Sequence, residues 1–138
     1  MTTDTPHTLV HLADSGLAVT AIDDVRGFEV VDVNGDEVGT VDDLVIDPEE
    51  KKVRFLQVGS GGFLGLGERK QLIPVDAISR IDDAKVHIAQ ERGHVAGAPT
   101  YDPDLVPARE YYEELYGYYG YAPFWASGYV YPPYPFHL

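Results

Sequence analysis

The chain has 138 residues, with 23 Asp and Glu against 10 Lys and Arg, so its formal net charge is −13. The length suits one domain, and the absence of cysteine excludes a disulfide framework, a zinc ribbon and a thiol nucleophile. The acidic balance opposes binding to a phosphate backbone, and no apolar run approaches the length of a membrane-spanning helix.

Residues 1–21 are expected to form an N-terminal arm. The start of the chain has neither the positive region nor the apolar region of a signal peptide, so we expect a cytoplasmic protein. Residues 17–22 alternate weakly between apolar and polar side chains and would suit an edge strand.

Residues 22–90 have the pattern of β-structure. Two β-branched runs, 28–33 and 37–41, flank Asn34-Gly35, which is the strongest short-range signal for a β-hairpin. The second strand continues through 44–46, but its apolar residues change parity between Val41 and Leu44. A bulge near residues 42–43 would explain that change.

Further short strands are predicted at 53–58, 71–75 and 85–88. Residues 76–80 suit a turn or a single helical turn. Short strands at this spacing indicate a small antiparallel barrel or sandwich, so the expected fold class is all-β.

The C-terminal part has a different composition. Residues 91–106 are predicted to be a linker, and 107–138 an appendage that begins with a helix at 107–117, marked by an early Pro and a final Gly. All ten tyrosines and the single tryptophan lie from Tyr101 onward. Beyond Gly117 the density of Pro and Gly predicts irregular or polyproline-like backbone.

Four segments of the chain together resemble the PRC-barrel domain, which is found in the H subunit of photosynthetic reaction centres and in a ribosome maturation factor. They are residues 24–27, 35–47, 53–56 and 72–78. The resemblance implies a small, highly twisted antiparallel β-barrel of about six strands. It also implies a module for binding and assembly, with no catalytic residues to transfer. Residues 1–21 are too short to be the RNA-facing domain that precedes the barrel in the maturation factor.

The glycine-rich stretch 59–67 does not match a phosphate-binding loop, because it leads into a predicted strand and lacks the Gly-Lys-Ser/Thr ending. We expect a connection between strands whose apolar residues cover the core or contact a protein partner. Those residues are Phe63, Leu64 and Leu66.

No catalytic residue, metal ligand or cofactor site is predicted. The run from Asp32 to Asp36 has carboxylates of a calcium loop, but Glu37 stands where an EF-hand requires Gly. The histidines (His7, His11, His87, His94 and His137) have no metal-ligand spacing, and no serine has a nucleophile-elbow context.

The aromatic tail is the main candidate for a contact site. Its residues are Tyr111, Tyr112, Tyr116, Tyr118, Tyr119, Tyr121, Phe124 and Trp125. They would pack on the chain's own barrel or on a symmetry mate, bind another protein, or remain disordered. Stacking on nucleic-acid bases is disfavoured, because Arg109 is the only Lys or Arg from Tyr101 onward.

The sequence therefore predicts a non-enzymatic module for protein–protein interaction or assembly, expected as a homo-oligomer that neither spans a membrane nor binds nucleic acid. An RNA- or ribosome-associated processing factor, by analogy with the maturation factor, is the alternative. A small-molecule enzyme would require a pocket with converging polar groups.

Overall fold

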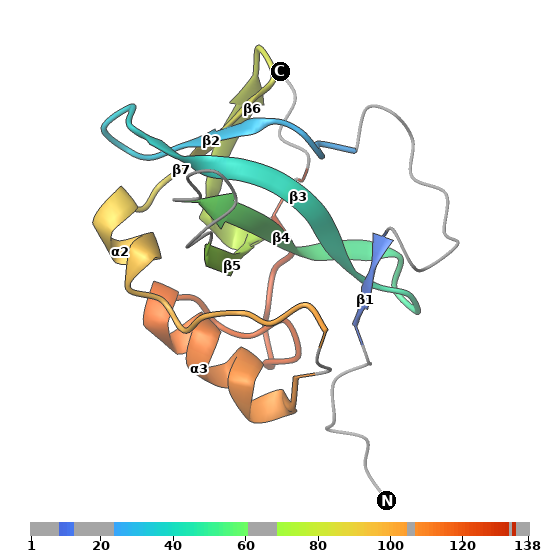
Figure 1. The fold of residues 1–138 in the computed structure, drawn as a ribbon. Coiled ribbons are helices and arrows are strands. Elements are labelled where there is room, and N and C mark those ends of the chain that lie inside the picture. Colours follow the sequence, from blue (N-terminus) through green and yellow to red (C-terminus); the bar gives the residue numbers. More distant parts are fainter. Residues whose placement is uncertain (1–8, 13–23, 61–68, 105–106, 133, 135–138) are drawn as a thin grey trace, which may run out of the picture.

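The computed structural model describes residues 9–12, 24–60, 69–104, 107–132 and 134. Within them, one sheet of seven strands carries the fold, with the order β5-β4-β3-β2-β7-β6 and β1 paired to β3 (Figure 1). The strands are β1 (Val10–His11), β2 (Glu29–Val31), β3 (Glu37–Asp47), β4 (Lys52–Ser60), β5 (Arg69–Pro74), β6 (Ile78–Asp82) and β7 (Lys85–Ile88). The expectation of a mainly β protein is confirmed.

The predicted hairpin at Asn34-Gly35 joins β2 to β3. Gly35 has a φ of 87°, a left-handed conformation that glycine adopts without steric cost. The Asp32 carboxylate accepts hydrogen bonds from the N–H groups of Asn34 and Asp36 at 2.9 and 2.8 Å. This side chain therefore fixes the turn that the sequence predicted.

The predicted bulge in the long strand β3 is confirmed. The register between β3 and β4 shifts between Val41 and Asp43, so Asp42 is the extra residue of a bulge. Asp42 is exposed, whereas every residue from Asp43 to Asp47 is buried. The C-terminal half of β3 is therefore covered on both faces.

Two features of the sheet differ from the prediction. The sheet is not wholly antiparallel, because β2 and β7 pair in parallel. Residues 76–80 were expected to form a turn or a single helical turn, but only 76–77 lie in the short 3-10 helix η1 (Val75–Ala77), and 78–80 begin strand β6. The turn from β6 to β7 uses Asp83 and Ala84 at φ values of 48° and 60°, so it carries none of the glycine signal from which hairpins are usually predicted.

The sheet does not close into a ring of paired strands within the described residues, where β5 and β6 are its two edges. The predicted edge strand at 17–22 lies outside those residues. A strand at β1 was not predicted. The predicted linker at 91–106 contains a short helix, α2 (Arg92–Ala96).

Helix α2 is held in place by contacts that the sequence pattern does not predict. Its Val95 is 1% exposed, and the buried amide of Gln71 on β5 donates to the carbonyl oxygens of Ala96 and Ala98 at 3.2 and 3.3 Å. Next in the chain, the Tyr101 N–H donates to the Lys70 carbonyl at 3.0 Å. The stretch after the sheet is therefore bound to strand β5.

The longer of the two described α-helices, α3 (Arg109–Tyr119), lies beneath the sheet in the view of Figure 1. It confirms the predicted C-terminal helix, and the described residues after it are irregular, as predicted. Neither helix is long and apolar enough to cross a membrane, as far as the described residues go.

Candidate interaction surface

Helix α3 places three tyrosines and a leucine against the sheet. Its buried residues are Tyr112, Leu115, Tyr116 and Tyr119, which share one face because they are three or four positions apart. The rings of Tyr112 and Tyr116 lie 5.4 and 5.1 Å from the ring of Phe55 on β4, within the range of aromatic contacts. Burial of each such side chain contributes about 2 kcal/mol, so this face fixes α3 to the sheet.

The helix ends at Tyr119 rather than at Gly117. Gly120 has a φ of 89°, and its N–H donates to the Tyr116 carbonyl at 2.9 Å, as does the N–H of Tyr121 at 3.0 Å. A left-handed residue of this kind ends many helices, whereas Gly117 keeps the helical path. The chain then turns into the stretch 121–134, which we call the aromatic segment.

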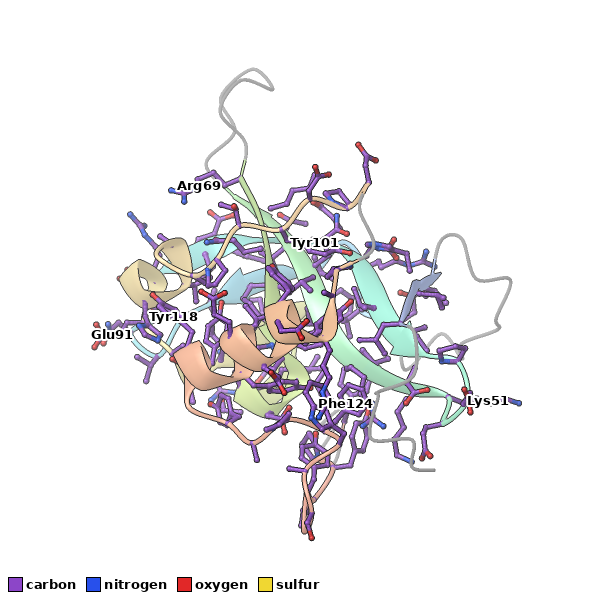
Figure 2. The ribbon with its side chains drawn as sticks, turned by 90° about the horizontal axis from the view of Figure 1, so that it is seen from below. Lys51, Arg69, Glu91, Tyr101, Tyr118 and Phe124 are labelled. Carbon is purple, nitrogen blue, oxygen red and sulfur yellow. The ribbon has the colours of Figure 1, made fainter. Side chains whose placement is uncertain are left out.

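Cationic side chains meet the rings of the aromatic segment. The Arg54 guanidinium lies 4.3 Å from the ring centre of Phe124 and 5.4 Å from that of Tyr131. Lys52 lies 5.5 Å from the Tyr131 ring centre, and Arg109 lies 5.3 Å from that of Trp125. All these distances allow cation–π attraction. Figure 2 shows Phe124 below α3 and away from Tyr118, which lies at the end of the helix where the segment begins.

Arg54 is itself part of a buried ion pair. Its Nη2 atom lies 3.4 Å from Asp47 Oδ2, and the two side chains are 5% and 0% exposed. The other Asp47 oxygen accepts the N–H groups of Glu49 and Glu50 at 3.0 and 3.1 Å. A charged pair that is buried in this way needs such partners to offset its loss of water.

Asp76, the middle residue of η1, lies at the same junction. The Tyr129 hydroxyl donates a hydrogen bond to Asp76 Oδ2 at 2.9 Å, and the Tyr131 hydroxyl donates to the Val53 carbonyl at 3.0 Å. Burial raises the pKa of Asp76 above its ordinary value, against the opposing effects of the Tyr129 hydrogen bond and the Arg54 charge. The aromatic segment thus covers a carboxylate that it only partly stabilises.

Two buried polar atoms at this junction, Arg54 Nε and Asp76 Oδ1, have no hydrogen-bond partner among the residues that the structure describes. Burial is the main cause that raises the pKa of Tyr116, and the charge of Asp76 acts in the same direction. Buried polar atoms normally have partners, so the segment closes over a polar cluster that is incompletely satisfied.

The structure separates the predicted contact residues into two groups. Tyr112, Tyr116 and Tyr119 are buried within the chain, so they are not free for a partner in this arrangement. The half-exposed group is Tyr111, Tyr118, Tyr121, Phe124 and Trp125. Tyr118 packs on α2, where its ring centre lies 4.1 Å from that of His94 (Figure 2). Phe63, Leu64 and Leu66 lie outside the described residues.

Sequence reasoning missed Lys52, Arg54, Tyr129 and Tyr131 as members of this site. The strand was predicted from residue 53, whereas β4 begins at Lys52, so Lys52 and Arg54 are two positions apart on one strand and leave the same face. Which ring meets which cation depends on the path of a Pro- and Gly-rich segment, and no periodicity encodes that path.

A second cluster joins the start of the described chain to its middle. His11 Nδ1 lies 3.2 Å from Asp43 Oδ2, and the Tyr101 hydroxyl lies 2.6 Å from His11 Nε2. Burial, followed by the charges of Asp43 and Asp102, raises the pKa of Tyr101 to about 12. The hydroxyl therefore remains protonated at neutral pH. The cluster connects β1 to β3 and to residue 101.

The described residues contain no group of three or more His, Asp or Glu side chains arranged to hold a metal ion. Asp32, the first carboxylate of the calcium-like run, also accepts the Arg92 N–H at 2.8 Å through its second oxygen. Both of its oxygens are thus occupied by backbone donors.

A family model for the PRC-barrel domain matches residues 19–94. These residues include strands β2 to β7, with the bulged strand β3 and the hairpin described above. The chain belongs to the PRC-barrel domain family.

The chain is also similar to an uncharacterized protein of Deinococcus radiodurans, with 36% identity over 61 residues. That similarity covers 44% of this chain and 21% of the relative. The chain thus spans about a fifth of the relative's length. In the PRC-barrel protein described here, α3 and the aromatic segment lie beyond the matched residues 19–94.

Proposed function

We propose that this PRC-barrel protein is a non-enzymatic module for protein recognition and self-assembly, with the outer side of the aromatic segment as its contact surface. The observation that supports the proposal is a run of half-exposed rings held on a structured scaffold. These rings belong to Tyr121, Phe124, Trp125, Tyr129, Tyr131 and Tyr134. Tyrosine, tryptophan and arginine are the residues most enriched among the anchors of protein interfaces.

Charge favours the same surface. The chain carries a formal net charge of −13, but residues 115–138 contain no Asp, Glu, Lys or Arg. A contact made through this stretch desolvates no carboxylate, whereas most of the remaining surface would bring acidic groups together. The aromatic segment is therefore the part of the molecule best suited to contact another acidic protein.

The absence of catalysis is part of the proposal. The polar groups that converge in the structure are engaged in structural contacts: Arg54 with Asp47, and His11 with Asp43 and Tyr101. None of them pairs an acid and a base across an open site of the described part of the chain, which general acid–base catalysis would require.

An RNA-associated role is less favoured by the same geometry. The cations beside the rings, Lys52, Arg54 and Arg109, already face aromatic rings of the chain itself. Single-strand binding needs both exposed rings and cations that reach phosphates.

Trp125 provides the test, because it is the only tryptophan. We expect acrylamide quenching of its fluorescence to fall as the protein concentration rises, together with an increase in the mass measured by light scattering. The Tyr134→Ser variant should need a higher concentration for both changes, and Val33→Ser, an exposed apolar residue at the distant hairpin (60% exposed), should behave as the wild type. Constant quenching and a single-chain mass at every concentration would contradict self-assembly through this surface.

A further inference from the structure

We propose that the aromatic segment is exchanged between two copies of the chain, so that the segment of each copy closes the Arg54–Asp76 junction of the other. The inference rests on the proposed function, since it specifies the partner as a second copy and the contact as a reciprocal exchange.

The attachment of the segment is made by side chains. Among described residues, the backbone-to-backbone hydrogen bonds of the segment beyond its helix cap are local turns: Ala126 to Pro123, Tyr129 to Ala126 and Tyr134 to Pro132. The connections to the body of the chain include the Tyr129 and Tyr131 hydroxyls, the Gln90 amide that donates to the Tyr121 hydroxyl at 3.1 Å, and rings that face cations or pack on Tyr116 and the core. No strand pairing has to break for the segment to leave, so opening leaves the sheet intact.

The closed junction is also imperfect. It buries Arg54 Nε and Asp76 Oδ1 without partners in the described chain. Opening a polar network of which some atoms lack partners costs little free energy, because water can then form hydrogen bonds with those atoms. This lowers the cost of opening, which is the barrier that an exchange must cross.

The hinge that an exchange requires lies at the end of α3. Gly120 is left-handed with a φ of 89° and is exposed, and Ala122-Pro123 follows it. Rotation of the backbone at Gly120 carries the segment away while the buried face of α3 stays on Phe55. Exchange of an identical element through a short hinge is a low-cost route to a dimer.

The uncharged segment makes a second copy a suitable recipient. The charge of −13 makes copies repel one another at low salt, whereas the aromatic segment brings no Asp, Glu, Lys or Arg into the second copy. The exchanged dimer should therefore form more readily as added salt screens the repulsion between the two negatively charged copies.

The absence of cysteine allows a direct experiment on the full chain. Val130 is 81% exposed beside Tyr131, and Lys52 Nζ lies 5.5 Å from the Tyr131 ring centre. A Val130→Cys chain and a differently tagged Lys52→Cys chain are mixed in concentrated salt and treated with a short bis-maleimide. Each chain has a single introduced thiol, so a cross-linked product with both tags joins two different copies, and its yield above that of the collision control measures how often a segment of one copy lies on the sheet of the other.

We expect a covalent product with both tags, and a wild-type mass of two chains in light scattering. Random mixing sets the upper limit at about half of the dimers. A Val33→Cys chain mixed with the Lys52→Cys chain controls for collisions and should give far less product, by about tenfold or more if the exchange positions the thiols. A chain with both Val130→Cys and Lys52→Cys shows that the cross-linker spans the gap.

Two results overturn the exchange, and the measured mass shows whether self-assembly fails with it. A mass of two chains without the two-tag product means that the copies associate in another way, which leaves the proposed function standing. A single-chain mass with cross-linking only inside the double variant means that the segment stays on its own chain. That result also contradicts self-assembly through the outer rings, and it leaves only their recognition of a different protein.

Discussion

Asp32 and Asp76 lie in environments that shift their pKa values in opposite directions. Burial of Asp32 opposes its ionisation, but the N–H groups of Arg92, Asp36 and Asn34 outweigh that effect and hold the pKa of Asp32 below its ordinary value. Asp76 has the Tyr129 hydroxyl as a donor, and burial raises its pKa. One carboxylate therefore stabilises the fold when ionised, and the other is disfavoured in its charged form.

Removal of the Asp32 charge should destabilise the protein in a pH-dependent way. A native pKa below the unfolded value means that the stabilisation is complete above the unfolded pKa of about 3.9 and is lost as pH falls through the native pKa. We expect Asp32→Asn to melt at a lower temperature than the wild type at neutral pH, with the difference shrinking below about pH 4. Thermal unfolding from neutral to strongly acidic pH measures this. Asp36→Asn, on the exposed part of the same turn, is the control. A difference in melting temperature between Asp32→Asn and the wild type that stays constant with pH would refute the lowered pKa of Asp32.

The opposite sign is expected at Asp76. Because its native pKa is raised, its contribution to stability is favourable below the unfolded pKa and is lost as pH rises through the native pKa. Asp76→Asn keeps an oxygen that accepts from Tyr129, so the variant should be at least as stable as the wild type at neutral pH and should lose that advantage near about pH 4. Urea unfolding at the two pH values tests this, and a variant that is less stable only at neutral pH would disprove it.

At the scale of elements, the sequence predicted what local chemistry encodes. Asn34-Gly35 predicted the hairpin, and the parity change between Val41 and Leu44 predicted the bulge. The parallel pairing of β2 with β7 and the helix α2 were not predicted, because they depend on contacts between distant residues. The rings of the aromatic segment were predicted as contact residues, but the cations that hold them come from β4 and α3.

Two glycines in different elements should respond oppositely to the same substitution. A Cβ on Gly39 in β3 would collide with the Gly59 carbonyl oxygen of β4 and lie 3.0 Å from Val58 Cγ1. A Cβ on Gly117 in α3 would meet nothing within 4 Å. We expect Gly39→Ala to cost about 2 kcal/mol through strain between the strands. Gly117→Ala should stabilise the protein by about 0.5–1 kcal/mol, because alanine favours the helix. Denaturant unfolding measures the change in the free energy of unfolding for each variant. Changes of the same sign in both would contradict the close approach of β3 and β4.

At the scale of the whole molecule, buried tyrosines should make alkaline unfolding cooperative. Burial raises the pKa values of Tyr112, Tyr116 and Tyr119 above the ordinary value for the phenol. A raised native pKa means that stability is complete below the unfolded pKa of about 10 and falls above it. We expect these tyrosines to ionise only as the fold opens, so that the ultraviolet absorbance of the phenolate and the circular dichroism show one shared transition. A smooth titration of all tyrosines near about pH 10, with the fold intact, would rule out the packing of α3 described here.

The packing of Phe55 beneath α3 also bears on how the chain is made. The family-matched residues 19–94 leave the ribosome before Tyr112 and Tyr116, whose rings lie 5.4 and 5.1 Å from that of Phe55. Domains generally fold from the N-terminus as synthesis proceeds. Here the face of the sheet that carries Phe55 is covered only after α3, in the last third of the chain, has been synthesised. During that interval the nascent sheet presents an uncovered aromatic face to the cell, and a pause in translation before residue 112 would prolong its exposure to chaperones.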